Sequence, residues 1–464
     1  MFTQFWSQSW YIQMFTVWMV ILVISRLKRY VLCKIYRAES VPRRGDWSFG
    51  FRFLYETIKE GQQGNYQEFI RQKMAGLKLH TASFKLAGKE IIITQNPENI
   101  KALLATQFND FILGSRHKCF HITLGDGIFT LDGDGWKHSR GLLRPQFSKD
   151  QVGHVKSLEP FTRLLIDCIS KTKGSSFDIQ PLFYKFTVDS GTDFLFGESC
   201  DSLVDHLSDS GIKHGSGIDG ETKKKFAQAF DYTQYMLHLR LNLQSLYWLG
   251  YTRKCLNILL AARDTTAGLL SFTFYLLSRN PHVYHKLRED ILESFGGGED
   301  CDISRITFES LKKFSYLKWV LNEVLRMYPS VPRNFRVSNK NTTLPRGGGP
   351  QHSSPIFVEK GTPVFYSVYS LHREEVYFGK DAHLFRPERW GEASLRQIGW
   401  AFLPFNGGPR ICLGQQFALT TASYVIVRLL QTFKEIQSFD DKFPPRLKKH
   451  LTMSLMDGAN ISLS

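Results

Sequence analysis

The start of the chain is apolar and carries no charge. No charged residue occurs before Arg26, and residues 10–24 are almost entirely apolar. Such a run is typical of a helix that crosses a membrane. Basic residues follow the run at once, whereas a cleaved signal peptide carries its positive charge before the apolar run. This order predicts an N-terminal membrane anchor, residues 1–25, followed by a basic juxtamembrane linker, residues 26–45.

The charges beside this segment also predict its orientation. The first acidic residue is Glu39, after a run of lysines and arginines, so the positive-inside rule places the remaining chain in the cytosol. Clustered basic residues at this position suit anionic lipid headgroups. The alternative is a buried or interfacial helix, since the strictly apolar stretch is shorter than the ~20 residues that a span prefers.

Hydrophobic periodicity in the rest of the chain predicts a mainly α-helical fold with small β-sheets. A β-branched run in residues 84–94 indicates two strands. Helical periodicity extends over four longer segments, which are 96–109, 150–170, 256–280 and 316–327. No repeat at a fixed period and no low-complexity linker divides the body, so we expect one large domain over residues 46–464.

Composition excludes several classes of protein. With 42% hydrophobic and 22% charged residues, the chain is too apolar for a disordered tail, and its 14% aromatic content suits a deep apolar pocket. The net charge of +16 favours an anionic partner. Nucleic acid is disfavoured as that partner because no groove-reading motif is present. The seven cysteines are odd in number and contain no CxxC pair, which argues against a disulfide framework or a zinc ribbon.

Three neighbouring residues have the chemistry of metal ligands. His117, Cys119 and His121 alternate along the chain, and alternate residues of a strand point the same way. No fourth ligand lies close to them in the sequence, so we do not expect a zinc site there.

The sharpest chemical signal is residues 405–414, FNGGPRICLG. Cys412 lies between glycines and follows Arg410 by two positions, as a thiolate requires if the backbone must turn tightly and direct N–H groups at sulfur. Such a thiolate can serve as the axial ligand of haem iron, although most isolated cysteines are small core residues. The segment fills every fixed position of Phe-x-x-Gly-x-Arg-x-Cys-x-Gly. Through it the chain resembles the cytochrome P-450 superfamily, whose fold we therefore expect after the transmembrane helix.

The resemblance extends to a structural network. Glu323 and Arg326 are three residues apart on a predicted helix, so their side chains meet on one side. Alone, such a pair is usually a surface ion pair of small value. Residues 385–390, FRPERW, resemble the family segment whose arginine completes a Glu-Arg-Arg network. The resemblance therefore implies that Glu323, Arg326 and Arg389 hold the Cys412 loop.

Four residues are implied as ligands of the haem propionates. Trp136 and Arg140 match the family's Trp-x-x-x-Arg pair. Arg410 is implied as a further propionate ligand, and so is Arg333, which rests on its spacing from Pro329 alone. The implied cofactor is haem b, with electrons from NADPH through a reductase.

Residues 261–266, AARDTT, lie in the middle of a predicted helix. By composition, Asp264 and Thr265 would be polar residues of an exposed face, but the resemblance makes them the acid and hydroxyl of the oxygen-binding helix. An acid beside a hydroxyl can deliver protons through water in a dry pocket. Ala262 departs from the family's usual glycine, and its methyl group is expected to crowd the oxygen groove.

Longer strings resemble one fungal branch, the n-alkane and fatty-acid hydroxylases. They are residues 125–133, 136–140, 341–350 and 401–404. The branch implies hydroxylation of long aliphatic chains by an endoplasmic-reticulum enzyme whose reductase docks near Lys137 and Arg144. A role in fungal secondary metabolism, on polyketide or fatty-acyl chains, is a close second. The expected apolar lining of the substrate pocket is Phe120, Ile122, Leu124, Ile128 and Phe129.

One stretch departs from the family. Only seven residues lie between Trp248 and Leu256, where the family places two helices and the first half of the oxygen helix. Some tens of residues that roof the pocket are therefore expected to be missing, either through mis-splicing of the gene or in a decayed copy. Their loss would admit water beside the haem. The alternative function is therefore a membrane-anchored haem-binding remnant without turnover.

Overall fold

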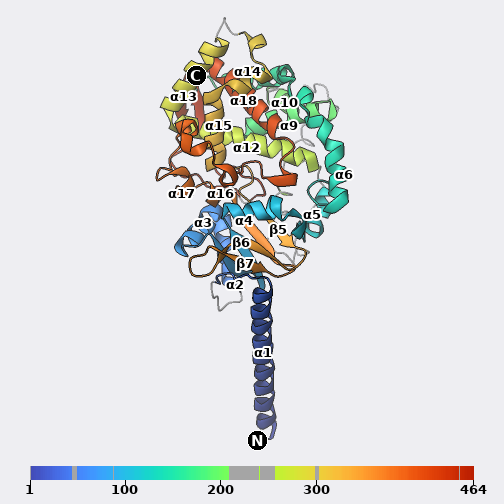
Figure 1. The fold of residues 1–464 in the computed structure, drawn as a ribbon. Coiled ribbons are helices and arrows are strands. Elements are labelled where there is room, and N and C mark those ends of the chain that lie inside the picture. Colours follow the sequence, from blue (N-terminus) through green and yellow to red (C-terminus); the bar gives the residue numbers. More distant parts are fainter. Residues whose placement is uncertain are drawn as a thin grey trace.

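The structure is a computed structural model that describes residues 2–43, 50–86, 88–207, 232, 240, 257–297, 302–448 and 450–464. Figure 1 shows one long helix at the N-terminus, a sheet-containing region next to it and a larger helical region beyond. The helices are α1 (Phe2–Ile35), α2 (Phe51–Gln62), α3 (Tyr66–Gly76), α4 (Pro97–Lys101), α5 (Arg116–Leu124), α6 (Gly133–Leu143), α7 (Lys149–Val152), α8 (Glu159–Ser170), α9 (Gln180–Phe196), α10 (Ser202–Leu207), α12 (Asn257–Arg279), α13 (Pro281–Phe295), α14 (Phe308–Lys313), α15 (Ser315–Met327), α16 (Val368–Leu371), α17 (Glu375–Phe378) and α18 (Gln415–Thr432). The strands are β1 (Thr81–Leu86), β2 (Lys89–Thr94), β3 (Phe111–Ile112), β4 (Phe177–Asp178), β5 (Arg333–Ser338), β6 (Thr342–Gly348), β7 (Ser354–Val358), β8 (Pro363–Ser367), β9 (Ile436–Ser438) and β10 (Asn460–Leu463).

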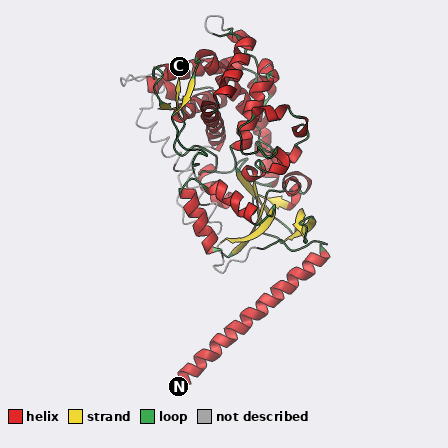
Figure 2. Ribbon diagram, turned by 90° about the vertical axis from the view of Figure 1, so that its left-hand side faces the viewer, coloured by secondary structure: helices red, strands yellow, loops and turns green. Residues whose placement is uncertain are grey.

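Helix α1 continues past the boundary that the sequence suggests. Residues 26–35, expected in a linker, belong to the same helix as the apolar run. Leucine, lysine and arginine are good helix formers, and no glycine or proline interrupts the segment. By length and composition, Trp10–Ile35 can cross a membrane. The helix projects away from the rest of the chain (Figures 1 and 2).

The C-terminal end of α1 is bound to the sheet region through Glu90 of β2. Arg29 donates to both Glu90 carboxylate oxygens, at 3.1 and 2.8 Å, and Ser83 and Arg43 donate at 2.7 and 3.2 Å. Burial raises the pKa of Glu90, but the Arg29 and Ser83 hydrogen bonds outweigh it, so this pKa lies below its ordinary value. The anchor therefore has a defined attachment to the domain.

A short backbone pairing reinforces this attachment. The Glu39 N–H donates to the Pro355 carbonyl at 2.8 Å, and the Phe357 N–H donates back to the Glu39 carbonyl at 2.9 Å. The ring of Tyr36 packs on Phe357, with centroids 5.3 Å apart. Strand β7 therefore holds the chain directly after α1.

The strand pair predicted for residues 84–94 belongs to a five-stranded sheet. Strands β1 and β2 are antiparallel, with Thr81 opposite Thr94 and Leu86 opposite Lys89, so the prediction for residues 84–94 is confirmed. They lie at one edge of a sheet with the order β1-β2-β8-β5-β3. Two smaller sheets have the orders β4-β10-β9 and β6-β7.

Helix α12 runs through the middle of the helical region and packs against α9, α15 and α18 (Figure 1). The helical predictions for 256–280 and 316–327 are confirmed by α12 and α15. The segment 150–170 is broken, because α7 ends at Val152, before Gly153, and α8 begins at Glu159. Glycine is a weak helix former, which accounts for the interruption.

The segment that contains His117, Cys119 and His121 is helix α5 and not a strand. Cys119 is buried, and both histidines lie on the surface. In a helix, residues two apart point in different directions, whereas residues four apart share a face. The helix therefore does not bring the three side chains to one face, as alternation along a strand would have done.

We expect Glu90→Ala to loosen the attachment of α1. Charged hydrogen bonds of this kind contribute about 1.5–3 kcal/mol, so tryptic cleavage after the exposed Arg37 should accelerate roughly tenfold in detergent solution. Because its pKa is lowered in the folded state, the Glu90 contribution is present at neutral pH and is lost as the pH falls through that lowered pKa.

The matched control is Glu359→Ala. Its partner Lys28 binds it at 2.8 Å, but the two side chains are 50% and 63% exposed. Exposed pairs contribute little, so this variant should be cleaved at the wild-type rate. Equal cleavage of Glu90→Ala and wild type would contradict the attachment.

Candidate haem site

The predicted cysteine loop is a tight turn before helix α18. The Cys412 N–H donates to the Phe405 carbonyl at 3.0 Å, which closes the loop. Gly408 has a φ of 68°, and a Cβ there would lie 1.8 Å from the Leu104 carbonyl oxygen, so only glycine fits. The motif therefore requires glycine at position 408 for a steric reason.

Cys412 faces a hollow within the protein. Its residue retains solvent-accessible surface although protein surrounds it closely. Burial raises the pKa of the thiol, while a hydrogen bond from the Gly414 N–H and the positive charge of Arg140 oppose that rise. Both opposing groups favour the thiolate, which is the form that binds a metal.

Glu323 lies at the centre of a buried ionic network. Its carboxylate accepts from Arg326 Nε at 2.9 Å and Nη2 at 2.8 Å, from Arg389 Nε at 2.9 Å and from Trp390 Nε1 at 3.0 Å. Glu323, Arg326 and Arg389 are at most 1% exposed. The three predicted network residues therefore come together, with Trp390 as an additional partner.

His372 connects this network with the cysteine loop. Arg326 donates to the His372 carbonyl at 3.0 Å, and the Leu403 N–H donates to His372 Nε2 at 2.8 Å. Burial lowers the pKa of His372 to about 3, so the ring is neutral and Nε2 remains an acceptor at physiological pH. No motif in the sequence marks His372, because a lone histidine is a common core residue.

A cluster of cations lies beside the cysteine loop, which itself contributes Arg410. Burial, together with the positive charge of the neighbouring Arg336, lowers the pKa of Arg116 to about 9. Burial also lowers the pKa of Arg410 to about 10. Arg410 pairs with Asp132 at 2.8 Å and lies over the Trp136 ring, 4.3 Å from its centroid.

Two members of this cluster have mainly neutral partners. Arg116 donates to the Asn334 side-chain oxygen and the Phe335 carbonyl, and Arg336 donates to the same carbonyl at 2.8 Å. Among the described residues, neither Arg116 Nε nor Arg336 Nε has a hydrogen-bond partner. Buried charges require compensation, so this cluster is suited to an anionic group.

Helix α12 carries the predicted proton-delivery residues. Thr265 Oγ1 donates to the Ala261 carbonyl at 2.6 Å, and Ser330 Oγ donates to the Thr265 carbonyl at 3.3 Å. Asp264 is 1% exposed and lies 3.4 Å from Arg263 Nη1. The acid and the hydroxyl are consecutive residues of the helix, and the acid lies next to the Arg263 guanidinium.

The surroundings of α12 explain two small residues in it. A Cβ at Gly268 would lie 2.7 Å from the Met453 carbonyl oxygen, so the C-terminal loop approaches the helix closely there. The Ala262 methyl group lies on the side facing α9, 3.8 Å from where a Cβ on Gly191 would be. The methyl group is therefore directed toward α9 at Gly191.

Comparison with known families decides the identity of this arrangement. The cytochrome P-450 family profile matches residues 47–247 and 250–463. The chain belongs to the cytochrome P-450 family. The prediction from the cysteine loop is thereby confirmed, and the protein is a haem monooxygenase with haem b as cofactor and electrons supplied from NADPH through a reductase.

Curated relatives cover this P-450 almost completely. Cytochrome P-450 52A12 of Debaryomyces hansenii is 49% identical over 98% of both chains, and cytochrome P-450 52A9 of Candida maltosa is 48% identical over 98% of both. The predicted fungal branch is therefore confirmed. A crystal structure of the cytochrome P-450DA haem domain has a TM-score of 0.71, at 19% identity over 92% of this chain and 97% of that one. The predicted fold is confirmed as well.

The residues of this P-450 fit haem b. Bound haem supplies the iron at which oxygen is activated. Cys412 offers a thiol to the hollow, and the buried cations Arg116, Arg336 and Arg410 offer donors to the two propionates. The guanidinium of Arg140 lies 5.9 Å from the centroid of the Trp136 ring, so this predicted pair belongs to the same group.

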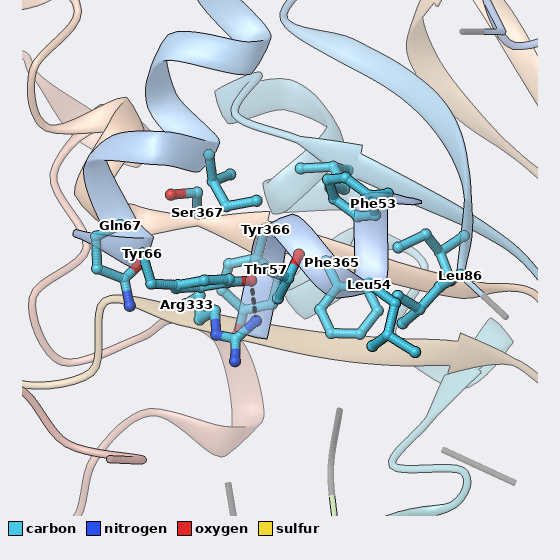
Figure 3. Close-up of a pocket in the computed structure, with 13 residues that line it drawn as sticks. Phe53, Leu54, Thr57, Tyr66, Gln67, Leu86, Arg333, Phe365, Tyr366 and Ser367 are labelled. Carbon is cyan, nitrogen blue, oxygen red and sulfur yellow. Dashed lines mark hydrogen bonds between the residues drawn. The ribbon is translucent and has the colours of Figure 1, made fainter. Parts of the chain in front are cut away.

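Arg333 lies elsewhere in the P-450. Its guanidinium donates to the Tyr66 hydroxyl and lies 4.3 Å from the centroid of that ring. Figure 3 shows this contact in a small apolar cavity between α2, α3 and the sheet, with Phe53 and Leu86 nearby. This placement disfavours the expected propionate role and points to Arg336 in its place.

The physical reason is the alternation of side chains along β5. Residues two apart in a strand share a face, so Arg336 lies with Asn334, whose side-chain oxygen also accepts from Arg116. Arg333 points to the opposite face. The alternation was readable in the sequence, but nothing there showed which face would meet the hollow, and Arg116 carried no motif.

We expect Arg336→Ala to release haem faster than Arg333→Ala. A charge-assisted hydrogen bond is worth about 1.5–3 kcal/mol, so losing the one from Arg336 should speed haem transfer to an apo-globin acceptor by roughly ten- to a hundredfold. Arg333→Ala should leave the transfer rate unchanged. The reverse order of the two variants would restore the assignment of Arg333.

Proposed function

We propose that this P-450 inserts one oxygen atom of O2 into long aliphatic substrates, such as alkanes and fatty acids. The observation that carries the proposal is the sequence identity of 49% and 48%, over 98% of each chain, with the two 52A relatives. The sequence strings that resemble the alkane and fatty-acid hydroxylases support it independently. A role in fungal secondary metabolism, on polyketide or fatty-acyl chains, rests on that resemblance alone.

In this proposal Cys412 is the axial ligand of the haem iron. Trp136, Arg140 and Arg410 bind the propionates, together with Arg116 and Arg336. Support comes from the uncompensated positive charge of the buried cluster and from the pairing of Arg410 with Asp132 at the Trp136 ring. Glu323, Arg326 and Arg389 position the cysteine loop and do not contact substrate, because all three are at most 1% exposed.

Asp264 and Thr265 deliver protons in this proposal. The hydroxyl of Thr265 holds its proton against the Ala261 carbonyl at 2.6 Å, an acceptor that it can exchange for water. The carboxylate of Asp264 is held in the protein interior by the Arg263 guanidinium, 3.4 Å away. A side-chain rotation of Asp264 would connect the pocket with solvent and renew the proton on Thr265.

The substrate would meet the apolar segment around α5. Phe120 and Leu124 are 5% and 4% exposed and so face the interior, while Ile128 and Phe129 are half-buried. The side chain of Ile122 lies outside what the structure describes. An apolar lining suits a hydrocarbon chain better than a polar substrate.

We place the enzyme in the endoplasmic-reticulum membrane, crossed once by α1, with the domain of residues 46–464 in the cytosol. The apolar helix and its basic flank support this orientation. An acidic reductase surface would dock near Lys137 and Arg144, both of which are exposed. The membrane lipid is the second expected partner, and nucleic acid is not one.

A second candidate function is a haem-binding remnant without turnover. The stretch from Trp248 to Leu256 lies outside the residues that the structure describes. The family profile is interrupted between residues 247 and 250, and the alignment with the Debaryomyces relative extends over 510 residues although this chain has 464. Both observations support an internal deletion at the pocket roof.

The test is turnover by the full chain in membranes that contain an NADPH-dependent reductase. We expect terminal alcohols from n-alkanes or fatty acids and, in the reduced protein with carbon monoxide, the absorption band of a thiolate-bound haem. Cys412→Ala should abolish both, and an unchanged band would contradict the ligand assignment.

A thiolate band without product would favour the remnant. In that case the matched variant carries the corresponding segment of the Debaryomyces relative between Trp248 and Leu256, and it should produce alcohol. A transcript that encodes extra residues across codons 245–260 would assign the deletion to the gene structure.

Thr265→Ala should leave haem binding intact and uncouple electron use from product. Without the hydroxyl, proton delivery is misdirected, and hydrogen peroxide should rise severalfold per NADPH consumed while alcohol falls. Thr265→Ser, which keeps the hydroxyl, is the control. Equal coupling in wild type and Thr265→Ala would rule out the relay.

A further inference from the structure

A group of possible metal ligands lies on the exposed face of α5, away from the haem site. His117 Nε2 is 2.8 Å from Asp126 Oδ1, and His121 Nε2 is 3.7 Å from the same oxygen. One ligand atom from each of the three residues lies within 4.8 Å of the other two. The two imidazole rings are neighbours, with centroids 4.8 Å apart.

The helix explains why these side chains converge. His117 and His121 are four residues apart and therefore lie one turn above the other on a single face. Cys119, two residues from each histidine, lies on the opposite face and is 0% exposed, and the neighbouring Phe120 is 5% exposed. Cys119 is thus separated from the histidines, and Asp126, beyond the end of the helix, takes the place of the missing ligand.

The separations suit a small transition-metal ion. Zinc binds imidazole nitrogen and carboxylate oxygen at about 2.0–2.2 Å, which places ligand atoms of a tetrahedral site about 3.3–3.5 Å apart. The distances of 2.8 and 3.7 Å bracket that range, so small rotations of exposed side chains complete the geometry. Two imidazoles and one carboxylate select zinc, copper or nickel over calcium or magnesium, which prefer oxygen ligands.

A bound ion would connect α5 with the loop that follows it. The helix ends at Leu124, and Gly125, whose φ is 61°, turns the chain so that Asp126 comes directly after it. The same turn is held by buried Thr130, which donates to the Gly125 carbonyl at 2.8 Å and accepts from the Gly127 N–H at 3.0 Å. A bound metal ion would therefore restrain the segment that leads from the end of α5 to Asp132, which pairs with Arg410.

We propose that His117, His121 and Asp126 form a binding site for a divalent transition-metal ion, with solvent in the remaining coordination position. The ion fastens the C-terminal end of α5 to the following loop. Because the other face of α5 is directed to the interior, metal binding stiffens one wall of the region where the proposed substrate lies. The metal site itself does not depend on the proposed substrate class.

The test uses full-length holoprotein in detergent, carrying an affinity tag without histidine, and zinc chloride as the probe. Isothermal titration calorimetry should show a zinc site that weakens by about tenfold or more in His121→Ala and in Asp126→Asn. Asp126→Asn retains an oxygen that can accept from His117, so it separates metal binding from the existing hydrogen bond. His285→Ala, which removes an exposed histidine of α13 paired with Glu435, should bind zinc as the wild type does.

Hydrogen exchange supplies a readout independent of turnover. Zinc should slow amide exchange severalfold in residues 117–130 of the wild type and leave it unchanged in Asp126→Asn. No zinc binding, or equal binding by wild type, His121→Ala and Asp126→Asn, would overturn the proposal. Failure of substrate hydroxylation would leave this result untouched, because neither measurement uses turnover.

Discussion

The buried carboxylate of Glu323 is the constraint around which the haem region is organised. A carboxylate without access to water is costly unless every lone pair is satisfied. Here two arginines and an indole donate to it, and those arginines in turn bind backbone carbonyls of residues 372–384. Helix α15 is thereby joined to the chain that precedes the cysteine loop, and removing any member leaves a buried charge uncompensated.

His372 extends this constraint to the cysteine itself. Its carbonyl belongs to the ionic network and its ring nitrogen accepts from Leu403, two residues before Phe405. Phe405 then accepts from the Cys412 N–H. The position of the thiol therefore depends on a chain of hydrogen bonds that begins at Glu323, in a dry environment where each bond is strong.

The cation cluster differs from this network because its charges have the same sign. Arg116, Arg336 and Arg410 lie together although their charges repel, and burial followed by the charge of Arg336 lowers the pKa values of Arg116 and Arg410. A protein tolerates such a cluster when an anionic partner offsets it. The ionic network is complete by itself, whereas the cation cluster is suited to a ligand that carries negative charge. That contrast distinguishes the residues proposed to support the cysteine loop from those proposed to bind the haem propionates.

Sequence and structure agree where the physical cause is local. The β-branched run in residues 84–94 pairs as expected, and the periodic segment that contains Glu323 is a helix because neighbouring turns bring its apolar residues to one face. The sequence left open whether residues 117–121 form a strand or a helix, and in the structure they belong to α5. Short segments with mixed polarity satisfy both periods, so only their packing decides between them.

The amino-acid sequence by itself determined the family, the cysteine loop and the Glu323 network, because their residues must stand at set spacings for steric and hydrogen-bonding reasons. The tertiary structure alone decided which arginines face the hollow, since Arg116 is more than two hundred residues from Arg336 and neither belongs to a local motif. It also decided that His117 and His121 meet Asp126, and that α1 is held by Glu90. Contacts between distant segments depend on how elements pack, and no local pattern records that packing.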